Sequence, residues 1–191
     1  MADTNKLYPI FLKTKQLNIL IIGGGYVALE KLSFLLKSSP DAQVDIVAPY
    51  FREETLAFLS DKKVTIIKDS YQEKYLNNKH IVVATTDDVP VNEQIYYDCK
   101  ARHILVNVAD NPPFCDFYMG GIVTKGNVKI AISTNGKSPT TAKRLRQFFE
   151  EVIPEDINRL VENLNKFRKT IKGDFEKKVK VLNEMTEGLI R

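Results

Sequence analysis

Short apolar runs and longer amphipathic stretches alternate along the first half of the chain. The apolar runs predict five strands, at residues 17–22, 44–48, 64–67, 81–84 and 104–108. The stretches after the first, second and fourth runs predict helices, ending near Leu36 and spanning 52–59 and 90–101. Because the runs are continuous in Ile, Val and Leu, they are typical of strands buried on both faces. The pattern predicts an α/β fold with a parallel, doubly wound sheet.

A different pattern begins after the sequence Asn-Pro-Pro at 111–113. Two β-rich runs, 116–124 and 128–134, are joined by Lys-Gly-Asn and predict a hairpin. The polar loop that follows leads into Pro139, a residue that often opens a helix.

Apolar residues at helical spacing dominate the rest of the chain. One helix is expected from Pro139 through about Glu151, and a second is expected to open at Pro154. The apolar spacing continues as far as Leu189, and such stripes are most simply core or subunit-contact faces. We divide the chain into three regions, an α/β domain at 1–112, a small α+β region at 113–150 and a helical region at 151–191.

The end of the first predicted strand carries a glycine pattern. Gly23-Gly24-Gly25 follows an apolar run, and Ala28 completes the spacing Gly-x-Gly-x-x-Ala at the start of an amphipathic helix. In that context Gly23 permits a tight turn, Gly25 lets backbone approach a pyrophosphate, and the helix N-terminus offers N–H groups to the anion. We expect a dinucleotide site in a Rossmann-type domain. The alternative is a glycine turn that only permits close packing.

Three further loops are expected beside this turn, because ligands gather at the carboxyl ends of strands in open parallel sheets. They begin after the second, fourth and fifth predicted strands. In the loop after the fourth strand, Thr85 and Thr86 are expected to contact the cofactor. Asp87 and Asp88 are expected at a helix N-terminus, where the helix dipole stabilises negative charge.

The loop after the second strand is where an adenosine ribose would lie. The acidic residue of the usual fingerprint is missing there, since Asp45 falls inside the strand. Backbone groups of Pro49 and Tyr50 are expected to hold the ribose instead. Arg52 lies nearby and leaves NADP open as an alternative to NAD.

A carboxylate follows the fifth predicted strand. Asp110 stands just before two prolines that fix the chain. At the end of a buried strand we expect it to be partly desolvated, and desolvation raises the proton affinity of a carboxylate. Asp110 is therefore the expected catalytic residue, taking up a proton near neutral pH. The alternative is that it only caps the turn.

Basic side chains cluster after the predicted hairpin. The net charge of the chain is +4, and residues 137–149 contain Lys137, Lys143, Arg144 and Arg146 with no acidic residue. Such a patch indicates an anionic partner, and a solvated helix face is the alternative. Nucleic acid is a poor candidate, because no recognised motif is present and aromatic residues do not interleave with the basic ones.

Composition indicates the class of protein and its cellular compartment. The 43% apolar and 27% charged content is ordinary for a globular protein, and no apolar run is longer than a strand. With no signal pattern and no CxxC spacing, Cys99 and Cys115 are expected to be free thiols in a reducing cytoplasm. His80 and His103 have no second ligand at metal spacing, so we expect no metal site. Because the apolar runs are too short for a transmembrane span, we also expect no membrane partner.

Taken together, the motifs resemble the precorrin-2 dehydrogenase / sirohydrochlorin ferrochelatase family of siroheme biosynthesis. The most specific part reads VNVADNPPFCDF at residues 106–117 and is followed by IAISTNGKSP at 130–139. The other matching motifs, in chain order, are LYPIFL at 7–12, GGGYVALEK at 23–31, VAP at 47–49 and ATTDD at 84–88. The order and spacing hold over about residues 7–150.

The resemblance implies an NAD-dependent oxidation of precorrin-2 to sirohydrochlorin, with Asp110 as general base. It implies NAD contacts at Tyr26, Val27, Pro49 and Tyr50, and a homodimer that pairs through the region 113–150. Some relatives also insert Fe²⁺, and this chelatase activity stays open. The substrate carries carboxylates, and the residues expected to bind it are Asn107, Ser133, Gly136, Lys137, Ser138 and Arg144.

Two other classes of protein share part of this pattern. A nucleotide-sensing regulatory domain would show the glycine turn, but it would not need Asp110 followed by a second β region and a basic helix. A structural dimerisation protein without catalysis is the third interpretation.

Overall fold

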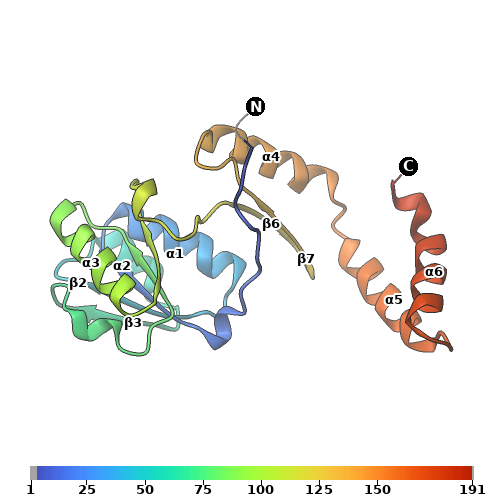
Figure 1. The fold of residues 1–191 in the computed structure, drawn as a ribbon, viewed down its shortest axis with the longest axis horizontal. Helices are drawn as coiled ribbons and strands as arrows, with labels where there is room; N and C mark the ends of the chain where they lie inside the picture. Colours follow the sequence, from blue (N-terminus) through green and yellow to red (C-terminus); the bar gives the residue numbers. More distant parts are fainter. Residues whose placement is uncertain (1–3, 191) are drawn as a thin grey trace. The chain divides into compact units, whose positions relative to one another are not determined.

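The computed structural model describes residues 4–190, which form two compact units (Figure 1). The first unit extends to Gly120 and includes the loop Ser133–Ser138, and the second comprises Gly121–Ile132 and the chain from Pro139 onward. The boundaries that we drew at residues 112 and 150 stay predictions. No helix among the described residues has both the length and the apolar content needed to cross a membrane.

The first unit contains the predicted parallel sheet. Its strands are β1 (Asn18–Ile22), β2 (Gln43–Ala48), β3 (Val64–Lys68), β4 (Ile81–Ala84) and β5 (Leu105–Val108). All pairs are parallel, and the order across the sheet is β3-β2-β1-β4-β5. Successive strands are therefore added on one side of β1 as far as β3 and on its other side from β4 onward, so the strand order reverses between β1 and β4. The predicted α/β, doubly wound fold is confirmed.

Burial differs between the centre and the edge of the sheet. Every residue of β4 is buried, as are the last four residues of β1. The expectation that all five strands are buried on both faces is wrong for β3, in which no residue is fully buried. The physical reason is its position at the edge, where it has only one neighbouring strand and less cover from helices.

Helices cover both faces of this sheet (Figure 1). On one face, α1 (Tyr26–Ser38) and α2 (Glu53–Leu59) share a core with β1, β2 and β4. On the other face, α3 (Val89–Ala101) and the 3₁₀ turn η2 (Glu73–Leu76) enclose a second core. Two shorter 3₁₀ turns complete the unit, η1 at Thr14–Gln16 and η3 at Pro112–Phe114.

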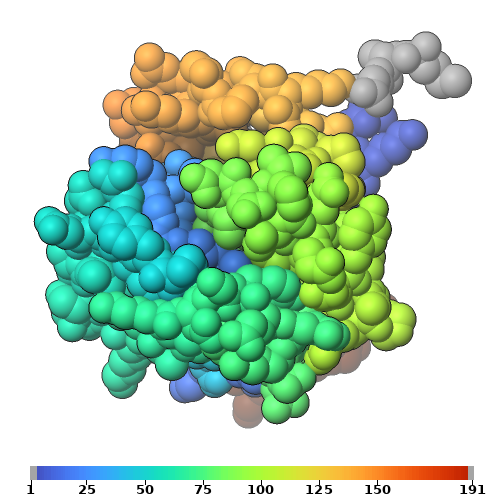
Figure 2. Space-filling model, turned by 90° about the vertical axis from the view of Figure 1, so that its left-hand side faces the viewer, coloured from blue at the N-terminus to red at the C-terminus, as the bar shows by residue number. Residues whose placement is uncertain are grey.

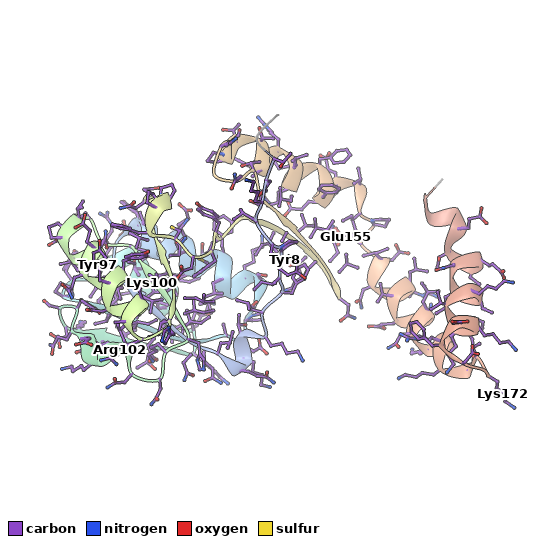
Figure 3. All side chains as sticks on the ribbon, in the orientation of Figure 1. Tyr8, Tyr97, Lys100, Arg102, Glu155 and Lys172 are labelled. Atoms are coloured by element: carbon purple, nitrogen blue, oxygen red, sulfur yellow. The ribbon has the colours of Figure 1, made fainter. Side chains whose placement is uncertain are left out.

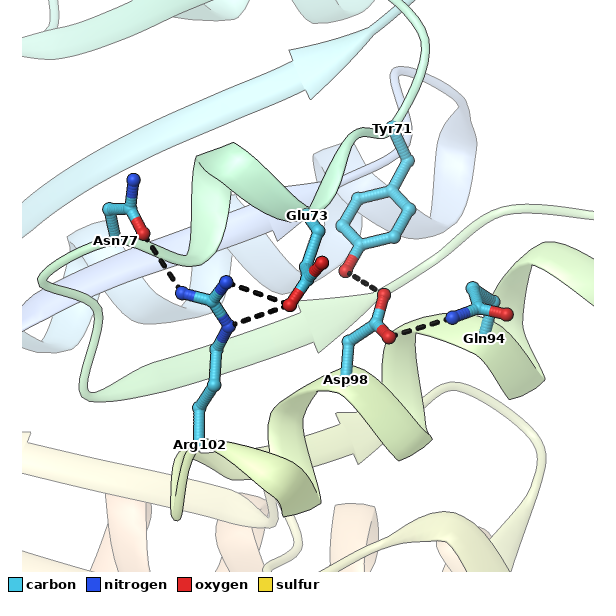
Figure 4. A network of polar contacts seen from close by, with 6 residues as sticks. All are labelled: Tyr71, Glu73, Asn77, Gln94, Asp98 and Arg102. Carbon is cyan, nitrogen blue, oxygen red and sulfur yellow. Dashed lines mark hydrogen bonds and ion pairs between the residues drawn. The ribbon is translucent and has the colours of Figure 1, made fainter.

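A polar network ties the segment around η2 to α3 (Figure 4). Arg102, labelled at the end of α3 in Figure 3, donates from Nη2 to the Glu73 carboxylate at 2.7 Å. The Tyr71 hydroxyl donates to the Asp98 carboxylate at 2.8 Å. Burial and the neighbouring Asp98 raise the pKa of Tyr71, so the phenol stays protonated. These contacts fix the β3–β4 connection over α3.

The second unit begins with the predicted hairpin, formed by antiparallel β6 (Gly121–Lys125) and β7 (Val128–Ile132). The prediction that the first strand starts at residue 116 is wrong. The segment 116–120 instead starts beside β5, where the Asp116 amide donates to the Val106 carbonyl at 2.8 Å. That bond holds the segment to the parallel sheet rather than to the hairpin.

Helices α4 (Pro139–Val152), α5 (Ile157–Thr170) and α6 (Phe175–Thr186) follow, and the 3₁₀ turn η4 spans Glu187–Ile190. The predicted helix at Pro139 is confirmed, and α4 packs on β6. Pro154 does not open α5: its carbonyl accepts from the Ile157 amide in a turn before the helix. The Leu189 side chain, predicted to end the apolar stripe, lies outside the described residues.

Contacts between charged and polar side chains join α5 to the hairpin turn. Lys125 forms an ion pair with Glu155, which is labelled in Figure 3. The Asn158 side chain accepts from the Asn127 amide at 2.8 Å. No residue of α5 or α6 is fully buried among those described, so their apolar stripes remain partly open to solvent.

Leu32 on α1 tests how much the first core stabilises the fold. Its side chain is fully buried, and Leu32→Ala is expected to lower the free energy of unfolding by about 3 kcal/mol through lost burial and an added cavity. Phe34→Ala on the same helix is the matched control, because Phe34 is 49% exposed and loses much less. Denaturant unfolding measures both. Equal losses would contradict the assigned packing face of α1.

Candidate cofactor site and its neighbouring carboxylate

The glycine turn lies where the sheet order reverses. Gly23 follows β1, and its amide donates to the Val47 carbonyl at 2.9 Å. Its φ is 120°, a left-handed conformation that glycine adopts without strain. A Cβ built there would lie 2.5 Å from Thr85 Oγ1. Gly23 is therefore required both by its backbone angle and by the close approach of the β4 loop.

The next two glycines face different surroundings. A Cβ on Gly24 would lie 2.3 Å from the Tyr50 carbonyl oxygen, whereas a Cβ on Gly25 would have no heavy atom within 4 Å. Gly25 is the N-cap of α1, and no side chain caps that helix end. The space before α1 is thus open and lined by backbone N–H groups. These features fit the pyrophosphate of a dinucleotide.

The predicted ribose loop lies beside this turn. Pro49 is exposed, and Tyr50 and Tyr26 are 72% and 60% exposed, so all three present accessible surface. Val27 is half-buried at the start of α1. Figure 2 shows the blue segment that contains the glycine turn set back in a hollow between cyan and green segments. The cofactor contacts of these residues stay predictions.

The loop after β4 holds its threonines in internal contacts. Thr85 is buried, and its hydroxyl donates to the Ile22 carbonyl at 2.9 Å, which fastens this loop to β1. The Thr86 hydroxyl donates to Asn92 Oδ1 at 2.8 Å. Asp88 caps α3 by accepting from the Val91 amide at 3.1 Å, as predicted for a helix N-terminus. Any contact of Thr85 with a cofactor must use atoms other than its donated hydroxyl hydrogen.

Asp110 occupies the carboxyl edge of the same sheet. It follows β5, which lies two strands from β1 with β4 between them, so about 10 Å separate the two strand ends. Its φ of 57° is left-handed, a conformation that Asp tolerates better than most residues. The expectation of partial desolvation is wrong for this structure, since Asp110 is exposed. The turn carries the carboxylate beyond the buried end of β5.

Asn107, which is buried, and Cys115, which is half-buried, form a brace under this turn. Asn107 Nδ2 donates to the Phe117 carbonyl at 2.8 Å and to Cys115 Sγ at 3.3 Å. The single thiol hydrogen is shared between the carbonyls of Val108 and Asn111, whose oxygens lie 3.2 and 3.3 Å from Sγ on either side of the Asp110 turn. Burial raises the pKa of Cys115, so the thiol keeps the hydrogen that these contacts need.

The brace changes the interpretation of two residues. Asn107 is buried and uses both amide hydrogens inside the protein, so its predicted contact with substrate would have to involve its oxygen. Cys115 was expected only to be a free thiol, and it is one. Its structural role was not predicted, and no local pattern in the sequence indicates it, because Asn107 and Cys115 meet across a turn.

The predicted substrate loop lies in the first unit and is closed on itself. Thr134 Oγ1 donates to the Ser138 carbonyl at 3.1 Å, and the Lys137 amide donates to the Thr134 carbonyl at 3.1 Å. Ser133 Oγ accepts from the Asn135 amide at 3.1 Å. Gly136 has φ 74°, and a Cβ there would meet no heavy atom within 4 Å. The loop is compact, with an open side at this glycine.

The remaining basic residues belong to α4, in the second unit. Arg144 is exposed and donates to Gln147 at 3.1 Å, while Arg146 forms an ion pair with Glu150. Lys143 is exposed. The substrate contacts of Lys137 and Arg144 stay predictions. Within residues 4–190, no three His, Cys, Asp or Glu side chains are grouped to hold a metal ion.

A parallel sheet with a glycine turn at its reversal point and an open helix N-terminus defines a nucleotide-binding protein of the Rossmann type. The family model "Putative NAD(P)-binding" matches residues 10–121, and the chain belongs to this family. A second model, "Sirohaem biosynthesis protein central", matches residues 125–151. The first unit is thus an NAD(P)-binding domain.

Named relatives include two bacterial siroheme synthases. The protein of Psychrobacter sp. (strain PRwf-1) is 39% identical over 166 residues, which cover 87% of this chain and 34% of that protein. The protein of Pseudoalteromonas atlantica is 39% identical over 168 residues, covering 88% and 36%. The chain therefore spans about a third of the length of these relatives.

A solved structure has the same fold. The chain named "SirC, precorrin-2 dehydrogenase" superposes with a TM-score of 0.72 at 23% identity, over 94% of this chain and 89% of that one. At this level of identity the likeness concerns the fold.

The two glycines of the turn are expected to respond differently to alanine. Gly24→Ala forces a Cβ against the Tyr50 carbonyl, which must shift, and is expected to lower the free energy of unfolding by about 2 kcal/mol or more. Gly25→Ala meets no atom and is expected to cost less than about 1 kcal/mol, the scale of an altered helix cap. Thermal or denaturant unfolding of both variants checks this order. The reverse order would contradict the packing described for the turn.

Proposed function

We propose that the chain is an NAD-dependent dehydrogenase that oxidises precorrin-2 to sirohydrochlorin. The observation that carries the proposal is the exposed Asp110 carboxylate, held in a left-handed turn at the sheet edge that bears the glycine turn. The motif around Asp110 and the names of the related proteins support the same substrate.

The oxidation removes one hydride and one proton from the macrocycle. When bound, the nicotinamide ring supplies the acceptor for the hydride. Asp110 accepts the proton on a carboxylate oxygen. The thiol and amide brace beneath the turn fixes the direction of that carboxylate, because it holds the carbonyls on both sides. The open N-terminus of α1 binds the negative charge of the cofactor.

Carboxylates at the rim of the tetrapyrrole account for the basic residues. In this proposal Lys137 and Arg144 pair with them, and the loop of Ser133, Gly136 and Ser138 donates hydrogen bonds beside Gly136, where the loop is open. Asn107 contributes through its oxygen and chiefly by positioning the turn.

A second copy of the chain is the proposed macromolecular partner. On α4, Leu145, Phe148 and Val152 are exposed and lie three and four residues apart, which places them on one helix face. An apolar face of this kind supports pairing through the region 113–150. The free state of both cysteines supports the cytoplasm as the compartment.

Asp110→Asn is the decisive variant for this reaction. Removing the base is expected to lower kcat about 100-fold or more, the scale of general base catalysis, and to leave the Kd for NAD unchanged. Asparagine also tolerates the left-handed conformation, so the turn is retained. NADH absorbance under anaerobic conditions, with precorrin-2 as substrate, measures the rate.

Asp87→Asn is the matched control, since Asp87 is exposed on the neighbouring loop after β4. It is expected to react close to the wild-type rate. Full activity in Asp110→Asn would remove Asp110 from the mechanism. Dinucleotide binding without any turnover in the wild-type protein would favour a nucleotide-sensing domain.

A further inference from the structure

A charged group stands at the ribose side of the glycine turn. The Arg52 guanidinium lies over the Tyr26 ring, 3.7 Å from its centroid, and Nη2 donates to the Tyr26 hydroxyl at 2.7 Å. On its other side, Arg52 Nε and Nη2 donate to the two carboxylate oxygens of Glu54 at 3.3 and 3.4 Å. Arg52 thus joins the first residue of α1 to the first turn of α2.

The backbone fixes this group beside the cofactor site. The Arg52 amide donates to the Gly24 carbonyl at 3.1 Å, which ties the residue to the glycine turn itself. In folds of this type, the residues after the second strand contact the adenosine ribose. A free arginine there accommodates the 2′-phosphate of NADP, and an acidic residue there suits NAD. This chain has both an arginine, Arg52, and an acidic residue, Glu54, after its second strand.

We infer that Glu54, acting through Arg52, makes the dinucleotide site select NAD over NADP. The inference rests on the dinucleotide site of the proposed function. Glu54 offsets the charge of the guanidinium and occupies its Nε and Nη2, which a 2′-phosphate would otherwise bind. Its own negative charge also repels that phosphate. Glu54 thereby takes the role of the acidic residue that favours NAD in such folds and that is missing at the end of β2.

The same contacts favour the ionised form of Glu54. Its own backbone N–H at the start of α2 and then the Arg52 side chain hold the pKa of Glu54 below its ordinary value. The stacking on Tyr26 limits the freedom of the guanidinium, so a phosphate that binds Nε and Nη2 must displace Glu54 from them.

The test measures dissociation constants of NAD and NADP by calorimetry on the whole chain. The wild-type protein is expected to prefer NAD. Glu54→Gln is expected to shift the ratio of the two constants about fivefold toward NADP, the scale of one exposed charge contact. Glu53→Gln removes the same charge one residue earlier on α2 and is the matched control, expected to leave the ratio unchanged.

The double variant Arg52→Gln/Glu54→Gln is expected to lose the shift toward NADP, because no guanidinium remains to bind the 2′-phosphate. An unchanged ratio in Glu54→Gln, an equal shift in Glu53→Gln, or a gain that survives in the double variant would each overturn the inference. A shifted ratio in a protein that fails to oxidise precorrin-2 would sustain the inference and remove the proposed reaction. If the wild-type protein oxidises precorrin-2 but the ratio does not shift in Glu54→Gln, the proposed reaction would stand and the inference would be overturned.

Discussion

The close approach of three loops at the glycine turn is the constraint on which the rest of the first unit depends. Thr85 leaves no room for a side chain at Gly23, and the Tyr50 carbonyl leaves none at Gly24. The same contacts bring the loops after β1, β2 and β4 together at one edge of the sheet. Gly25 differs, since no atom of the protein fills the space that its missing side chain leaves. Two glycines are thus required for packing, and the third keeps open the place where an anion can meet the start of α1.

Sequence patterning predicted most of this fold because its elements follow simple rules. Continuous Ile and Val runs identified β1 and β4, which are buried on both faces. The rules failed at the start of two elements. Asp116 looks like the start of a strand, yet its amide pairs with Val106 beside the parallel sheet. Pro154 looks like a helix start, yet it sits in a turn before α5. The first bond joins residues ten positions apart and has no local signature in the chain, whereas the second closes a turn between residues only three positions apart.

The candidate site was predictable in position more than in detail. The glycine turn and Asp110 were found because both lie at strand ends, a place that the strand pattern itself specifies. The brace made by Asn107 and Cys115 was not found, since it joins residues eight positions apart across a turn whose path local patterns do not define. The exposure of Asp110 was also misjudged. A buried strand says where the turn begins, and the left-handed backbone of Asp110 decides where its carboxylate ends up.

That exposure constrains how the carboxylate could act as a base. Asp110 is exposed to solvent, and a hydrated carboxylate is a weak base toward carbon-bound hydrogen. A broad, flat substrate laid over the carboxyl edge of the sheet would exclude this water as it binds. The protein then needs to supply only direction, which the left-handed turn and the thiol brace provide. In the proposed reaction the substrate therefore completes the site, because it excludes the water that the protein alone leaves around the exposed carboxylate.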